Sequence, residues 1–470
     1  MDLPPAAAND PAAGWVLLNR YGIRTDDSFA ADAKTVAYSR TYTGQNLRVS
    51  FGRAPPPASS FFHYDFPESV PGMEDIDDNA EECEEDSDYT DECKEEGDSD
   101  DECKEQEVDI NKLGIIVVGA HSTSARSMKL TYRGSYDFED HHFLYWAGGA
   151  ASPATFSRLP DRIFLTKAEQ AYLSPPTHRR PDFEDTCLLR LGDNDMMLVE
   201  LGLMYDRDAR RYMAEFCLLR NGMSQWELLE PVPIIRDEGG KDIEQLHTQC
   251  GRNTIIPLGD RFLCWVKYIS GFLLCNMEDE ESPKVRYVPL PPGVCWYPKG
   301  YQRDMSIKHS KNMGAVGPSA VGFVSIDPRC CCGGTGKSTC SHSRYAFTIN
   351  TWLMNINSIN EPLTWVKDGE IDCEELWRLP GYEGLPRANP MCPIVCLDNP
   401  DVVCFLVSNN AFVSSYDYED RKRWMIQLNI KTKQLSVVPY NDDRRGAYDH
   451  LPVTLHSSAA NAGLKFTAVQ

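Results

Sequence analysis

Residues 254–291, TIIPLGDRFLCWVKYISGFLLCNMEDEESPKVRYVPLP, decide the fold. β-Branched, aromatic and other apolar side chains predominate in four segments, as they do in strands: residues 254–258, 261–269, 272–277 and 285–290. Gly259-Asp260 and Ser270-Gly271 separate the first three segments and are typical of tight turns, in which glycine takes a positive φ. An acidic loop precedes the fourth segment. We therefore predict one four-stranded antiparallel meander.

The second of these segments is apolar on both of its sides. Leu263 and Trp265 alternate with Phe262, Cys264 and Val266, and successive side chains of a strand point to opposite faces. A strand without a polar side is typical of a sheet that is covered on both faces. We therefore expect Trp265 to pack in a core between sheets. We expect the same of three other tryptophans: Trp226, Trp365 and Trp424.

Comparable strand units begin near residues 114, 187, 320 and 393, and together with the unit at residue 254 they recur at intervals of 66 to 73 residues. Regular four-stranded units with Gly and Asp turns favour a β-propeller over a sandwich or a barrel. The strands before residue 70 supply one more unit, so we expect an all-β, propeller-like fold of about six blades. Two short helices are also predicted, near residues 167–173 and 373–379.

We assign residues 14–456 to a single propeller-like domain, between a disordered N-terminus (1–13) and a C-terminal tail (457–470). Residues 70–110 interrupt this domain as a disordered acidic insertion built on a decapeptide repeat. Its centre, residues 74–109, holds 21 acidic side chains and two lysines, and so carries −19 of the formal net charge of −23. Such a segment buries too little apolar surface to offset the entropy lost on ordering. Metal chelation, phosphorylation and docking are the functional alternatives to a solvated loop.

The composition of the chain indicates in which compartment the protein lies and which classes of partner it binds. With 42% hydrophobic residues, a chain of 470 residues can form a large core. Seventeen cysteines and no signal-peptide pattern at the N-terminus indicate reduced thiols, so we expect a cytoplasmic or nuclear protein. No apolar run reaches the ~18 residues of a membrane helix. Short basic clusters do not outweigh the acidic balance, so we expect neither a membrane nor a nucleic acid as a partner.

Residues 333–339, GGTGKST, are similar to a phosphate-binding loop but do not fit its pattern. A Walker-type loop has a glycine at the position of Cys331, and the helix that follows it directs its first amides at the phosphate. Residues 345–354 have the composition of a strand instead. We therefore predict no nucleotide site and no cofactor.

Cys330, Cys332, Cys340 and His342 are candidate zinc ligands, because thiolate and imidazole groups bind zinc. Their spacing is unlike that of structural zinc sites, which usually present two pairs of ligands, each pair separated by two to four residues. We therefore interpret this segment as a reduced, cysteine-rich loop and predict no metal site, with zinc binding as the alternative.

Catalytic motifs are absent from the sequence, which has no nucleophile elbow and no cysteine in a recognised catalytic context. Four carboxylates near the second predicted helix raise the question of acid–base catalysis: Glu370, Asp372, Glu374 and Glu375. A solvated helix face explains these side chains better than a catalytic pair does. We therefore predict that the protein is not an enzyme.

Four stretches resemble the grass-expanded plant family known as domain of unknown function 1618. They are GDRFLCWVKYISGFLLCNM with VRYVPLP, NMGAVGPSAVGFVSIDPRCCCGG, WVKDGEIDCEELWRLPGYEGLPR and DNPDVVCFLV, and the N-terminal GWVLLNRYG is similar to the family's opening. The resemblance covers about residues 15–456 but not the acidic insertion. It implies a plant intracellular protein with no established activity and no catalytic residues to carry over.

The residues and the resemblance together favour a non-enzymatic protein–protein interaction module. Such a module binds a protein partner, which the sequence does not identify, through its propeller loops. The alternative is a zinc-dependent sensor or enzyme centred on the cysteine-rich loop, residues 330–342.

Overall fold

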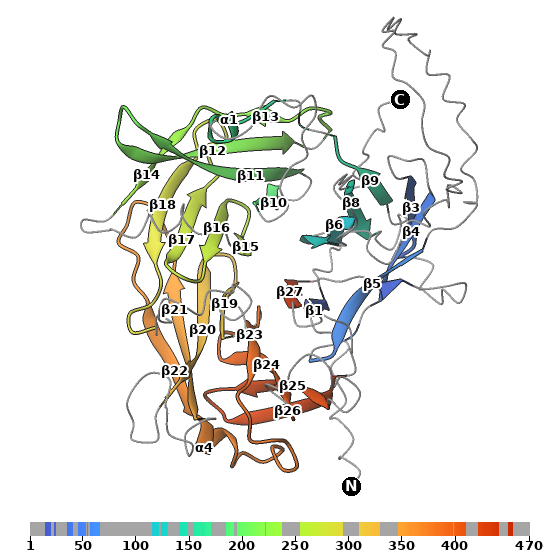
Figure 1. Cartoon of the computed structure of the whole chain (residues 1–470), viewed down its shortest axis with the longest axis vertical. Helices are drawn as coiled ribbons and strands as arrows, with labels where there is room; N and C mark the ends of the chain where they lie inside the picture. The colour runs from blue at the N-terminus through green and yellow to red at the C-terminus, as the bar shows by residue number, and fades with distance from the viewer. Residues whose placement is uncertain are drawn as a thin grey trace, which may run out of the picture.

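The structure is a computed structural model of the chain. It describes residues 15–19, 23–24, 35–40, 46–52, 54, 57–65, 115–121, 124–129, 141–147, 155–160, 162, 164–170, 185–191, 195–220, 222–236, 254–294, 310–329, 346–397, 399–409, 422–440 and 450–454. This part of the chain is nearly all β-strand, with two short helices, α1 (Lys167–Gln170) and α4 (Cys373–Leu376) (Figure 1). Both helices lie where the sequence predicts them. Within the described ranges, no helix has both the length and the apolar character needed to cross a membrane.

The predicted meander at residues 254–291 is confirmed. Its strands are β15 (Thr254–Leu258), β16 (Phe262–Lys267), β17 (Gly271–Asn276) and β18 (Lys284–Pro289). Each strand pairs antiparallel with the next along the chain. Local composition and turn signals are therefore enough to form this unit.

The turn between β16 and β17 differs from the predicted two-residue loop. Lys267 pairs with Gly271, so residues 268–270 make the connection. Gly271 does not take a positive φ, whereas Gly259, in the preceding turn, does, with a φ of 57°. A Cβ atom at Gly271 would lie 2.4 Å from the carbonyl oxygen of Val288. Glycine is needed at this position because β18 leaves no space for a side chain.

The meander is one half of a nine-stranded sheet. The other half contains β10 (Thr186–Leu191), β11 (Asp195–Asp206), β12 (Arg211–Arg220) and the short β13 (Glu227–Leu228). Strand β14 (Val232–Ile235) joins the halves, because it pairs antiparallel with β12 and parallel with β18. The parallel pairing with β18 is not part of the predicted pattern of separate antiparallel meanders.

Two further sheets are four-stranded antiparallel meanders, as predicted. The first contains β19 (Lys311–Ala315), β20 (Ala320–Pro328), β21 (Phe347–Asn355) and β22 (Val366–Asp372). The second contains β23 (Met391–Val395), β24 (Val402–Ser408), β25 (Arg423–Asn429) and β26 (Gln434–Pro439). In both sheets the spatial order of the strands is their order in the sequence.

The two N-terminal sheets depart from simple meanders. One has the order β7 (Ser124–Lys129), β6 (Ile115–His121), β8 (His141–Ala147) and β9 (Thr155–Arg158). Its β6 and β8 are parallel, since the chain crosses over between β7 and β8 instead of turning back. The other has the order β27 (His450–Thr454), β1 (Trp15–Asn19), β5 (Ser59–Asp65), β4 (Asn46–Gly52) and β3 (Ala37–Arg40), with β2 (Ile23–Arg24) beside β5.

One edge strand of each unit contacts an edge strand of the next. β7 contacts β10, β10 contacts β15, β15 contacts β19, and β19 contacts β23. β23 then contacts β27, and β27 contacts β7. These contacts return to their starting point, so the sheets follow one another around a circle (Figure 1). The fold is β-rich and propeller-like.

The core consists of apolar layers between neighbouring sheets, and β16 contributes to two of them. Leu263 and Trp265 belong to a cluster shared with the β10–β12 unit, which includes Phe216. Phe262, Cys264 and Val266 belong to a cluster shared with β20 and β21. These five of the six side chains of β16 are at most 3% exposed. The predicted burial of both faces of this strand is confirmed.

Trp265 connects the two halves of the nine-stranded sheet by a hydrogen bond as well as by packing. Its Nε1 donates to the carbonyl oxygen of Asp185 at 3.2 Å, and its ring lies edge-on to Phe216 with the centroids 6.4 Å apart. Trp226 is also buried, and its Nε1 donates to the carbonyl oxygen of Pro160 at 2.8 Å. Trp365 is half-buried against the second cluster, and Trp424 is half-buried.

Trp265→Ala is expected to lower the free energy of unfolding by about 3–5 kcal/mol, because it leaves a cavity between two sheets. Chemical denaturation, followed by far-ultraviolet circular dichroism, measures the change. Met223→Ala is the control, since Met223 is 61% exposed and its truncation should stay within about 0.5 kcal/mol of the wild type. A Trp265→Ala variant with the wild-type midpoint would contradict the burial of this strand between two sheets.

Candidate functional site

The residues that the sequence singles out for zinc cannot be placed. Cys330, Cys332, Cys340 and His342 lie outside the described residues, as does the acidic insertion at residues 70–110. Among the residues that the structure does describe, no three His, Cys, Asp or Glu side chains are grouped in a way that could hold a metal ion. The zinc hypothesis therefore stays a prediction.

The carboxylates near α4 are engaged in capping and ion pairs. Oδ1 of Asp372 accepts the backbone N–H of Glu374 at 2.8 Å and caps the helix, while its Oδ2 lies 2.6 Å from Nη2 of Arg329. Glu374 pairs with Arg378, one helical turn later, at 3.3 Å. Each of these two carboxylates therefore pairs with a cation.

The other two carboxylates of this group face lysines. Glu375 lies 3.1 Å from Nζ of Lys433, in the turn between β25 and β26. Glu370 forms an ion pair with Lys367 on the same strand. The predicted solvated face is thus a face of exposed or half-exposed ion pairs, which contribute little to stability individually.

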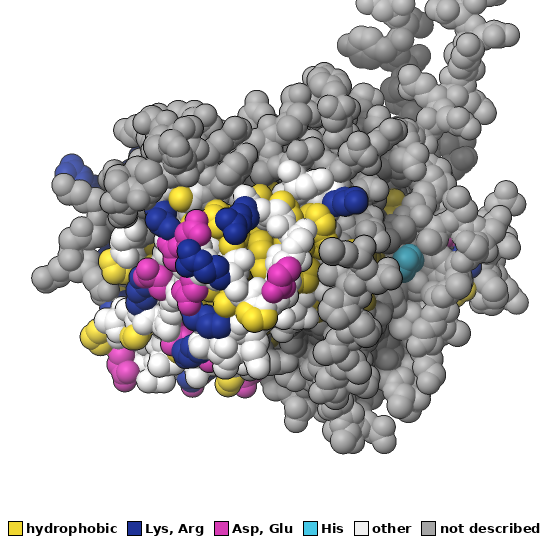
Figure 2. All heavy atoms as spheres, turned by 90° about the horizontal axis from the view of Figure 1, so that it is seen from below, with side chains coloured by type: hydrophobic (Ala, Val, Ile, Leu, Met, Phe, Trp, Pro, Cys, Tyr) yellow, Lys and Arg dark blue, Asp and Glu magenta, His cyan; other side chains and the backbone are white. Residues whose placement is uncertain are grey.

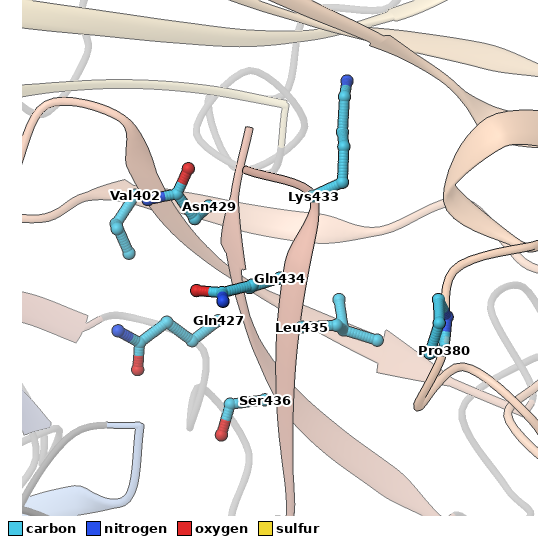
Figure 3. A pocket seen from close by; sticks show the side chains of 8 residues that line it. All are labelled: Pro380, Val402, Gln427, Asn429, Lys433, Gln434, Leu435 and Ser436. Carbon is cyan, nitrogen blue, oxygen red and sulfur yellow. The ribbon is translucent and has the colours of Figure 1, made fainter. Parts of the chain in front are cut away.

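An open hollow of about 560 Å³ adjoins this face, at strand β26 (Figure 3). It is lined by Pro380, Val402, Gln427, Asn429, Lys433, Gln434, Leu435 and Ser436. The pairing register places Val402 beside Asn429 and Asn429 beside Gln434, and it places Gln427 beside Ser436. These residues therefore share one face of the sheet, and Leu435 and Pro380 lie on the other side of the strand (Figure 3).

The amide side chains in the hollow differ in what they bind. Oδ1 of Asn429 accepts the backbone N–H groups of Lys431 at 3.1 Å and of Thr432 at 2.8 Å, and so closes the turn. Gln427 and Gln434 have no hydrogen-bond partner within the described chain, so their amides are open to a ligand. No carboxylate, imidazole or thiol lines the hollow, and its chemistry is therefore that of hydrogen bonding.

Ion pairs hold the turn beside the hollow in place. Nζ of Lys431 lies 2.6 Å from Asp401 and 3.1 Å from Asp368, which is on β22 of the neighbouring sheet. Hydrogen bonds to Asp401 and then to Asp368 raise the pKa of Lys431. Side chains of both signs are interleaved on this side of the molecule, with apolar side chains between them (Figure 2). The surface therefore presents no block of charge of one sign.

A second candidate is the hairpin of β11 and β12, which lies at the upper left of Figure 1. The register of β10 with β11 ends at Glu200, and among the described residues β11 pairs with β12 alone beyond Leu201. Tyr205 is 46% exposed, and its ring lies edge-on to Tyr212 across the hairpin with the centroids 5.0 Å apart. The guanidinium of Arg236 lies 6.0 Å from the centre of the Tyr212 ring.

The tip of the hairpin is rich in arginine. Arg207, Arg210 and Arg211 are exposed, and no ion pair engages them within the described chain. Oδ1 of Asp206 is occupied by the turn itself, since it accepts the backbone N–H groups of residues 208 and 209 at 2.9 and 3.0 Å. Arg210 has a φ of 49°, which the tight turn imposes. Aromatic and arginine side chains together are typical of protein–protein interfaces.

Sequence reasoning identifies neither candidate. The amides of the hollow are scattered over β25 and β26 and come together only through register. The hairpin carries a signal in its length, because β11 and β12 have 12 and 10 residues while β10 has only six. Strands that are longer than the neighbouring strand of a sheet extend past its end.

Residues 265–404 match the family model described as a protein of unknown function, DUF1618, and the chain resembles that family. No curated protein matches the chain. Among solved structures, an α-L-arabinanase of Penicillium chrysogenum complexed with arabinobiose is similar over 60% of this chain and 71% of its own, with 10% sequence identity and a TM-score of 0.27. A likeness at that score bears on neither the activity nor the ligand of this chain.

Asn429→Ala is expected to lower the free energy of unfolding by about 0.5–1.5 kcal/mol for each hydrogen bond lost, because two backbone N–H groups of the turn lose their acceptor. Gln434→Ala is the matched control and should leave stability within about 0.5 kcal/mol of the wild type, since its amide is exposed and unpartnered. Denaturant midpoints measure both changes. Equal losses for the two variants would mean that the Gln434 amide also supports the fold.

Proposed function

We propose that the chain is a non-enzymatic protein–protein interaction module on a six-bladed propeller, with the β11–β12 hairpin as its binding element. The observation that carries the proposal is the extension of this hairpin past β10, with Tyr205 and three arginines exposed near its tip.

Two observations support six blades. The edge-strand contacts pass through β7, β10, β15, β19, β23 and β27, which are one strand from each of six units. The nine-stranded sheet counts as two of these units, because only the two-residue pairing of β14 with β18 joins its halves. β27, from the C-terminal part of the chain, pairs with β1, and such a pairing closes a propeller.

Ending the chain at residue 449 is expected to lower the thermal midpoint by several degrees, because it removes β27. Five residue pairs with β1 disappear, and backbone groups buried in a closed ring then lack partners. Differential scanning calorimetry measures the midpoint. A chain ending at residue 456 keeps β27 and is the control, which should unfold at the wild-type temperature. If the shorter chain unfolds there too, β27 does not close the ring.

The clustering of exposed apolar side chains favours the hairpin as the contact point. Of the four large apolar side chains that are exposed to more than a third in the described chain, Met223 and Val366 lie elsewhere, whereas Tyr205 lies on the hairpin and Ile235 lies beside it on β14. Such side chains gain most from burial against a partner. By contrast, the charges of Lys431 and Lys433 are already paired with carboxylates of the same chain. The zinc-dependent alternative at residues 330–342 has no described residue in its support.

Tyr205→Ala is expected to reduce the capture of specific proteins from an extract of the source organism by about tenfold or more, as for an interface hot spot. Quantitative mass spectrometry of proteins bound to wild type and variant measures the change. Met223→Ala, which removes an exposed side chain outside the hairpin, should leave the captured set unchanged. Identical sets for all three proteins would argue against the hairpin as the binding element.

A further inference from the structure

We infer that the free edge of β11, from Gly202 to Asp206, binds an extended acidic peptide of a partner by β-strand addition. The inference rests on the proposed function and names the chemistry of the partner. Two independent observations carry it, both made within the described part of the chain: backbone groups along the strand that have no partner there, and arginines beside them that have no acidic partner there.

The backbone groups without a partner lie on the side of β11 that faces away from β12. Leu201 donates its backbone N–H to the carbonyl oxygen of Asp185 at 3.0 Å, and among the residues that the structure describes this is the last hydrogen bond on that side of β11. The N–H and C=O groups of alternate residues in a strand point to the same side. Leu203 and Tyr205 therefore direct two N–H and two C=O groups outward, because β12 pairs with the opposite side. The edge of five residues spans about 17 Å.

An exposed strand edge of this kind is a template for another chain, and proteins usually protect it. Neither a bulge nor a proline interrupts β11 between Gly202 and Asp206. Peptide-binding domains use such edges, where backbone hydrogen bonds give affinity and pockets for alternate side chains give specificity. Here Tyr205 and Tyr212 form an apolar surface on one face of the hairpin, against which alternate side chains of a peptide can pack.

The charges beside the edge select an acidic ligand. Arg207, Arg210 and Arg211 are exposed at the tip, and Arg236 lies over Tyr212. The acidic groups on the tip are Asp206, whose Oδ1 accepts two backbone N–H groups of the turn, and the exposed Asp208. The four guanidinium groups thus outnumber the two carboxylates.

Elsewhere in the described chain, some arginines have carboxylate partners, whereas the exposed Arg387 has none and lies over the ring of Trp377. Arg329 pairs with Asp372, and Arg378 pairs with Glu374. A guanidinium group binds a carboxylate through two parallel hydrogen bonds, so the unpaired arginines of the tip are suited to the side chains of a Glu- or Asp-rich segment. The occupant that fits both edge and charge is therefore an extended acidic peptide.

The test is a fluorescence-anisotropy titration of the full-length protein into a fluorescein-labelled peptide of alternating valine and glutamate. We expect saturable binding that weakens as salt rises from about 50 to about 500 mM, because the arginine contacts are exposed. The double variant Arg207→Gln with Arg211→Gln should bind about tenfold more weakly or worse, while Lys422→Gln, an exposed lysine on another sheet, should bind as the wild type does. A peptide with glutamine in place of glutamate should lose binding to the same extent.

Strand addition has its own controls. A peptide N-methylated at every second residue cannot pair with the edge and should bind at least about tenfold more weakly than the unmodified peptide. Leu203→Pro removes an outward N–H group and should have the same effect, with circular dichroism to show that the variant folds. Binding that depends on the arginines but not on N-methylation would overturn strand addition.

Two further outcomes also overturn the inference. Absence of saturable binding up to about 1 mM protein does so, and the proposed function still stands if capture from extract depends on Tyr205. Light scattering that shows a dimer of the wild type and a monomer of Leu203→Pro would assign the edge to a second copy of the chain. In that case the free edge is an oligomer contact.

Discussion

Strand β16 buries both of its faces, and the rest of the structure depends on this constraint. Phe262 and Cys264 pack toward the sheet of β19–β22, while Leu263 and Trp265 pack toward the β10–β12 half of the nine-stranded sheet. A sheet with two apolar faces needs a sheet on each side, and each of those needs another. A row of such sheets is complete only when its ends meet, which the contacts from β23 through β27 to β7 achieve.

The sequence predicts the parts of the fold that local pattern controls. Alternation and turn residues are enough for the meander at 254–291 and for the burial of Trp265. The parallel pairing of β14 with β18 has no local signal, because it joins residues about 50 positions apart. The need for glycine at position 271 is not predictable from local sequence either. It comes from the carbonyl oxygen of Val288 on the paired strand β18, which leaves no room for a side chain, and not from the φ of Gly271.

Functional residues are less predictable from this sequence than the fold is. The cysteines at 330, 332 and 340 attract attention by composition, and they lie outside the described residues. Gln427 and Gln434 carry no motif, and only the register of β25 and β26 brings them to one hollow. In the sequence, Arg207 and Arg211 are ordinary turn residues. The strand edge beside them is evident only from the pairing of β11 within the described chain.

The bridge made by β14 also bears on how the molecule moves. Backbone hydrogen bonds, and not side-chain packing alone, connect the β10–β13 unit with the meander β15–β18. A shared hydrogen-bond ladder must break before its two halves separate. Separating these two units therefore requires breaking the short ladder between β14 and β18 in addition to their side-chain packing.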